Sequence, residues 1–126
     1  MSTTVLYLPK FLPTSLNKSV GRHWSVKAKQ KNGDLEIVQH YAREQRLAMT
    51  LHLDAALPAR RVNVRMVLPK GQRAFDRDNI LKGLLDALVQ CGLLVNDSPR
   101  WCQIGQIEYV RHDGGLRETF VILEDL

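Results

Sequence analysis

The segment from residue 80 to residue 89 constrains the fold most, because its apolar residues recur at the spacing of a helix. The set comprises Ile80, Leu81, Leu84, Leu85, Leu88 and Val89. Such a wide apolar stripe must be buried against another element. Asp76 and Asp78 precede it as candidate N-caps, and Gly92 follows as a C′ residue. We therefore expect a core helix over 79–91.

Shorter patterns elsewhere predict strands and a second helix. Residues 61–68 alternate between apolar and polar side chains, as in a half-buried strand. The runs 5–8, 104–110 and 119–123 are also typical of strands, and the Asp113-Gly114-Gly115 turn predicts a hairpin between the last two. Helical spacing covers about 34–48, with an alternative start near Ser25 and an irregularity at Asn32-Gly33.

These elements occur in the order strand, helix, strand, helix, strand, strand. That order predicts an α+β fold in which helices cover one face of a sheet. We expect a small mixed sheet of about four strands with two main helices packed on one face. Residues 1–126 are expected to form a single domain of this kind.

The charge of the chain is basic and unevenly distributed. Lys and Arg total 18 against 13 acidic residues, a formal net charge of +5. Residues 1–33 contain no acidic residue at all. A positive surface of this kind favours polyanionic partners. The alternative is a basic α+β domain with no role on nucleic acid, which would bind DNA weakly and with little dependence on salt.

The cysteines and histidines do not indicate a zinc site. Cys91 and Cys102 lack metal-site spacing, and the four histidines are scattered. We expect both cysteines to be core thiols in a reducing, cytoplasmic compartment. No run is long enough to span a membrane, and Pro9 and Lys10 interrupt the only early apolar run, so no signal peptide is expected.

Four of the 13 acidic residues fall in one stretch: Asp76, Asp78, Asp86 and Asp97. Asp76 and Asp78 lie two positions apart where a loop enters the helix, and carboxylates that close repel each other. A divalent cation removes that cost, and Mg²⁺ prefers such hard oxygen ligands. Lys82 follows one turn into the helix, on the same face as Asn79, where it could contact a phosphate. Alternatively, the first two acids only cap the helix, and Lys82 and Asp86 form a surface ion pair.

The position of Asp97 depends on the path of the chain after the helix. A helix over 79–91 rises about 18 Å, and residues 92–97 can return roughly 16 Å if extended. Asp97 therefore approaches Asp76 and Asp78 only if Leu93–Val95 runs antiparallel to the helix. Otherwise it serves a neighbouring subunit or makes a turn before Pro99.

The pattern Asp76-x-Asp78-Asn79-x-x-Lys82-x-x-x-Asp86-x-Leu88, followed by Gly92 and Asp97, resembles the RusA family of Holliday-junction resolvases. The run Pro13–Asn17 is similar to the P-P-S-x-N run of that family. Two positions depart from the family pattern. Asn96 replaces the first residue of a later acidic pair, and Phe75 stands where a basic residue often precedes the first aspartate.

The resemblance implies a small homodimeric endonuclease of bacterial or phage origin, acting in the cytoplasm. Such enzymes use Mg²⁺, with Mn²⁺ as an alternative ion, to cut branched DNA at a four-way junction by paired nicks, without a small-molecule cofactor. By the same resemblance, Asp76, Asp78 and Asp97 would bind the metal and Lys82 would be the catalytic lysine. Asn79 and Asp86 would support the site.

Basic residues around this site are expected to bind DNA phosphates, which positions DNA without reading its sequence. The set comprises Lys18, Arg22, His23, Trp24, Lys27, Lys70 and Arg73. Trp24 could stack on an unpaired base or belong to the core. Two alternatives stay open: a flap or fork nuclease, and a catalytically silent protein that binds branched DNA. The apolar stretch 84–95 is the first place to look for a dimer interface.

Overall fold

A computed structural model describes the chain in four segments. They are residues 2–13, 24–47, 57–72 and 77–126, with the backbone alone for 24–32, 77 and 79. The strands are β1 (Thr3–Pro9), β2 (Arg60–Pro69), β3 (Cys102–His112) and β4 (Glu118–Asp125), and the helices are α1 (Trp24–Glu44) and α2 (Arg77–Gln90). Their order along the chain, β1-α1-β2-α2-β3-β4, is the predicted one.

The helices agree with the periodicity of the sequence. α2 covers the predicted apolar stripe, and Gly92 follows it with a φ of 86°. α1 starts at Trp24, close to the alternative start near Ser25, and runs without interruption through Asn32 and Gly33. The expected irregularity there was therefore wrong. A glycine within a helix costs only about 1 kcal/mol, which the packing of a long helix can offset.

The four strands form one mixed sheet in the order β1-β4-β2-β3. β4 pairs antiparallel with both β1 and β2, and β2 pairs parallel with β3. The predicted hairpin between β3 and β4 is wrong, because β2 lies between them. β4 buries Thr119, Val121 and Leu123 and suits the interior of the sheet, whereas β3 is largely exposed and suits an edge.

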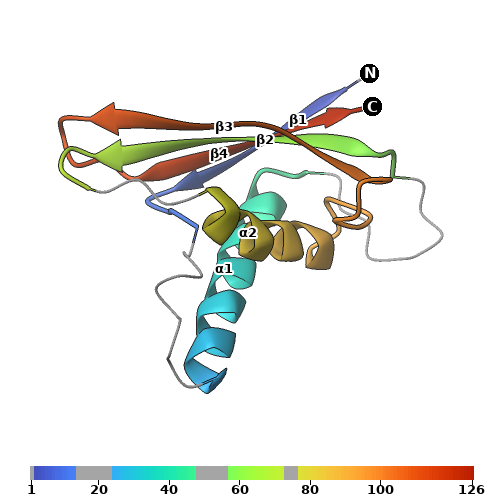
Figure 1. The fold of residues 1–126 in the computed structure, drawn as a ribbon, viewed down its shortest axis with the longest axis horizontal. Coiled ribbons are helices and arrows are strands. Elements are labelled where there is room, and N and C mark those ends of the chain that lie inside the picture. The colour runs from blue at the N-terminus through green and yellow to red at the C-terminus, as the bar shows by residue number, and fades with distance from the viewer. Residues whose placement is uncertain (1, 14–23, 48–56, 73–76) are drawn as a thin grey trace.

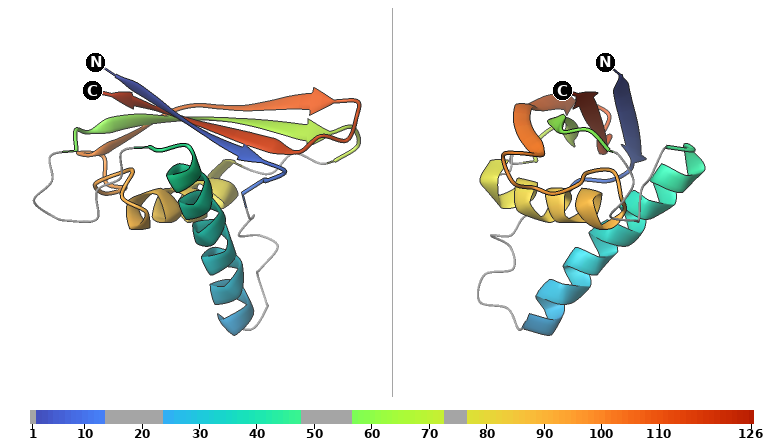
Figure 2. Two further views of the ribbon diagram at one scale, coloured as in Figure 1. Left: turned by 180° about the vertical axis from the view of Figure 1, so that it is seen from behind. Right: turned by 90° about the vertical axis from the view of Figure 1, so that its right-hand side faces the viewer.

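Both helices lie on the same face of the sheet (Figures 1 and 2), as predicted. Val38 and Ala42 of α1 and three of the four leucines of α2 share one buried cluster with the inward residues of β2. No helix in the described segments is long and apolar enough to cross a membrane. Neither of the described helices covers the other face of the sheet, and Val5 there is 47% exposed.

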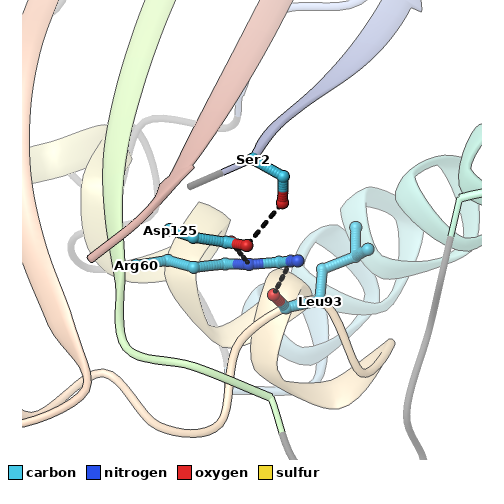
Figure 3. Close-up of polar contacts among 4 residues, drawn as sticks. All are labelled: Ser2, Arg60, Leu93 and Asp125. Atoms are coloured by element: carbon cyan, nitrogen blue, oxygen red, sulfur yellow. Dashed lines mark hydrogen bonds and ion pairs between the residues drawn. The ribbon is translucent and has the colours of Figure 1, made fainter.

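At the end of the sheet where β2 begins, buried Arg60 connects four segments (Figure 3). Its Nε donates to Asp125 Oδ1 at 2.9 Å, and its Nη1 donates to the carbonyl of Leu93 at 2.8 Å. Ser2 Oγ donates to the other oxygen of Asp125. The start of β1, the end of β4 and the loop after α2 are thereby held together.

Candidate functional site

The N-terminal end of α2 carries the predicted acidic site. Asp78 lies in the first turn, where the helix dipole favours a carboxylate, and is exposed. Lys82 is four residues further and is also exposed, so both side chains lie on the solvent face of the helix. Neither has an ion-pair partner among the described residues. The pair is therefore open to a ligand from solvent.

The other members of the predicted set are described less fully. Asp76 lies just before α2 and outside the described residues. Asn79 belongs to α2, but its side chain is not described, and Asp86 is half-buried one turn beyond Lys82. Within the described segments, no three His, Cys, Asp or Glu residues are grouped so that they could hold a metal ion. The three-aspartate metal site stays a prediction.

The loop after α2 keeps Asp97 at the opposite end of that helix. α2 ends in a Schellman motif, in which Gly92 N donates to Val89 O at 3.1 Å and Leu93 N to Leu88 O at 2.9 Å. The loop then buries Leu93 and enters β3 at Cys102. Figure 1 shows this loop at the C-terminal end of α2, whereas Asp78 lies in the first turn, so Asp78 and Asp97 of one chain lie at opposite ends of a 14-residue helix that spans about 21 Å.

A turn at 96–99 was predicted, and the structure contains it. Asn96 Oδ1 accepts a hydrogen bond from Ser98 N at 2.9 Å, which is an Asx turn. Asn96, one of the two departures from the family pattern, thus has a structural role in shaping the loop. Exposed Asp97 is close enough to Cys102 that its charge acts on that thiol.

The cysteines are buried free thiols, as predicted. Burial raises the pKa of the Cys91 thiol to about 11. Burial, and then the negative charge of Asp97, raise the pKa of Cys102. Both residues are therefore protonated at neutral pH and unsuited to act as nucleophiles or metal ligands.

The predicted DNA-binding residues fall mostly where side chains are not described. Lys18, Arg22, His23 and Arg73 lie outside the described residues, and Trp24 and Lys27 belong to α1 without described side chains. Figure 1 shows that this end of α1 projects away from the sheet. Lys70 is exposed in the turn that follows β2.

Two arginines that were not among the predicted site residues bind Gln72, the last described residue before α2. Gln72 ends a turn closed by its own N–H donating to Pro69 O at 3.1 Å, with Gly71 at a φ of 88°. Arg111 Nη1 donates to the carbonyl of Gln72, and Arg117 Nε donates to its Oε1 at 3.1 Å. Gln72 is thus held by β3 and by the residue that precedes β4.

No sequence signal could have indicated these contacts, because Gln72 lies 39 and 45 residues from the two arginines and meets them only when β2 pairs with β3 and β4. No protein-family model matches the chain, and the search of curated proteins finds no match. The function is therefore inferred from the residues themselves and from where the fold places them.

Proposed function

We propose that this protein is a divalent-metal-dependent, structure-selective endodeoxyribonuclease that resolves four-way DNA junctions by paired nicks. The observation that carries the proposal is the placement of Asp78 and Lys82 on one exposed turn at the start of α2. A carboxylate and a cation four residues apart combine a hard ligand for Mg²⁺ with a donor for phosphate. The basic charge of the chain suits the polyanionic substrate.

In this proposal, Asp78 and Asp76 hold the metal, and Lys82 contacts the scissile phosphate. A bound divalent ion would supply Lewis-acid activation of water and of the phosphoryl group. Lys82 stays protonated and neutralises the charge that develops on the phosphate oxygens. Asp97 of the same chain lies at the other end of α2. An Asp97 that acts at this site would therefore belong to the second subunit of a homodimer.

The apolar stretch 84–95, first considered as a dimer interface, is largely used by the core of one chain. Leu84, Leu88 and Leu93 are buried there, and only Val95 is substantially exposed. The uncovered face of the sheet offers more surface to a second copy. A two-fold dimer would bring two sites to the two strands that must be cut.

The test is cleavage of a labelled mobile four-way junction with Mg²⁺, compared with linear duplex, flap and fork substrates. The wild type should give paired, symmetric nicks in the junction. Asp78→Asn should lower the cleavage rate at least about 100-fold and leave junction binding equal or tighter, because a charge that repels phosphate is gone. Preferential cutting of flaps or forks would instead identify a different structure-selective nuclease.

A mixing experiment separates the two possible roles of Asp97. If Asp97 completes the site of a partner subunit, a mixture of inactive Asp78→Asn and Asp97→Asn proteins regains single-strand nicking, because heterodimers then contain one intact site. If both residues serve the same subunit, the mixture stays inactive. Tight junction binding with no cleavage under Mg²⁺ or Mn²⁺ would contradict the enzymatic proposal and favour a silent DNA-binding protein.

A further inference from the structure

A basic pocket lies at the end of the sheet where β1, β2 and β3 end. Its volume is about 520 Å³, and its lining residues are Lys10, His112, Gly114, Gly115, Leu116 and Arg117. They come from the end of β1, the end of β3 and the connection that leads into β4. The strand register explains the grouping, since Pro9 lies beside Glu118 and Pro69 beside His112.

The charge of this pocket is positive, and its cations are available. No acidic residue lines it. Lys10 is exposed and has no ion-pair partner among the described residues, and Arg117 bonds only to the neutral Gln72 there. His112 Nδ1 accepts a hydrogen bond from Gly114 N at 3.0 Å, so the neutral ring carries its proton on Nε2 and is a donor.

The nearby acids do not cancel this charge. Glu118 keeps its negative charge and accepts a hydrogen bond from the neutral Tyr7 Oη at 2.5 Å. Asp113 is exposed in the connection before β4. Against these two stand Lys10, Lys70, Arg111 and Arg117 at the same end of the sheet.

We infer that this pocket binds a phosphate of the DNA backbone, with Lys10 and Arg117 as the contacting cations. The inference rests on the proposed function for the identity of the polymer. A run of cations along an open rim fits an extended phosphodiester chain better than a single small anion. Lys70 and the Gln72 turn adjoin this pocket, because Arg117 of the pocket donates to Gln72 and Pro69 pairs with His112.

Lys10→Gln is the sharpest probe of this inference. Lys10 has a φ of 54°, and Gln keeps the same Cβ, so the backbone strain is unchanged while the charge is removed. Arg117→Gln alone is less informative because it also releases Gln72. Arg100→Gln is the matched control, since Arg100 is an exposed cation beside Trp101 at the opposite end of β3.

Binding of a fluorescently labelled four-way junction and of linear duplex is measured by anisotropy at several salt concentrations, in EDTA so that nothing is cut. Losing one phosphate contact should reduce the slope of log K against log salt by about 0.9 and weaken binding roughly threefold or more at moderate salt. Lys10→Arg should restore both values, and Arg100→Gln should match the wild type. Circular dichroism and the midpoint of thermal unfolding establish that each variant is folded.

The inference is overturned if Lys10→Gln and the double variant Lys10→Gln/Arg117→Gln keep wild-type affinity and slope. It is also overturned if the wild-type protein shows no salt-dependent DNA binding. A weakened Lys10→Gln variant of a protein that never cleaves DNA would support this pocket and contradict the nuclease proposal. The experiment therefore distinguishes failure of the phosphate-binding pocket from failure of the nuclease proposal.

Discussion

Asn63 and Gly105 show how single residues shape the sheet. The β2–β3 register pairs Val62 with Ile104 but Val64 with Ile107, so two residues of β3 lie opposite Asn63. This is a β-bulge. Asn63 Oδ1 accepts a hydrogen bond from Gln106 N at 2.9 Å, and its Nδ2 donates to Glu124 Oε1 at 2.6 Å. The Asn63 side chain thus supplies a hydrogen-bond acceptor at the bulge and connects β3 to β4 across β2.

Gly105 is required at this bulge because a side chain there has no space. A Cβ atom would lie 2.0 Å from Asn63 Oδ1. Gly105→Ala should therefore lower the free energy of unfolding by about 1–3 kcal/mol, as other overpacking substitutions do. Gly33→Ala is the control: nothing lies within 4 Å of its Cβ in α1, so it should stabilise by about 0.5–1 kcal/mol. Urea denaturation measures both, and equal effects of the two substitutions would contradict this account of the bulge.

At the residue scale, local pattern predicted part of the candidate site. Asp78 was expected where the helix begins and Lys82 one turn into it, and the structure agrees. The bulge at Gly105 and the basic pocket around Lys10 were not predicted. Both depend on which strands become neighbours, and that is decided by long-range pairing and not by local spacing.

The two helices end in the same way, although only one of them has a glycine there. After α1, Leu47 N donates to Ala42 O and Arg46 N to Arg43 O, both at 3.0 Å, which again is a Schellman motif. Arg46 occupies the left-handed C′ position with a φ of 57°. The sequence predicted the end of α2 through Gly92 but gave no such signal for α1.

Arg46→Gly should stabilise the protein by about 0.5–1 kcal/mol, because glycine adopts the left-handed conformation without the steric cost that a Cβ imposes. The same change at Arg43, in the last turn of α1, should destabilise by about 1 kcal/mol, since glycine is a poor helix former. Both arginines are exposed, so the loss of charge is matched. Thermal unfolding of both variants at one pH gives the comparison, and their changes in stability should have opposite signs. A loss of stability in both would argue against strain at the left-handed Arg46.

At the scale of elements, the bounds and the order of helices and strands were predictable, but the pairing of the strands was not. The periodicity of 80–89 and the alternation in 61–68 fixed one helix and one strand, because each depends on neighbours within a few residues. The Asp113-Gly114-Gly115 turn suggested a hairpin, yet the connection crosses β2 instead. A turn sequence permits a reversal of the chain but does not choose its partner strand.

At the scale of the whole molecule, the Arg60 network closes the fold at one end. Asp125 N donates to Ser2 O, and Leu126 N donates to Ala59 O, both at 2.9 Å. Arg60 adds its bonds to Asp125 and Leu93. The beginning of β1, the beginning of β2 and the end of β4 are therefore joined to the loop that carries Asp97.

This network makes the stability of the protein depend on pH in a defined direction. The hydrogen bond from Ser2, followed by the hydrogen bond and positive charge of Arg60, lowers the pKa of Asp125 from its ordinary value of 3.8. A carboxyl group with a lowered pKa in the folded state contributes stability above its unfolded pKa and loses it as the pH falls through the folded pKa. The contribution is thus complete at neutral pH and disappears in acid, at pH values below about 4.

Asp125→Asn should therefore destabilise the protein at pH 7, and the difference from wild type should shrink as the pH falls below about 4. Asp113→Asn is the matched control, because Asp113 is exposed and has no ion-pair partner among the described residues. Its effect on unfolding should be small at every pH. Urea midpoints across this range give the measurement. A constant difference between Asp125→Asn and wild type would mean that the Arg60 network contributes through shape and not through the charge of Asp125. Arg60→Leu, which removes the Arg60 donors to Asp125 and to the Leu93 carbonyl, should cost about 2–4 kcal/mol at pH 7.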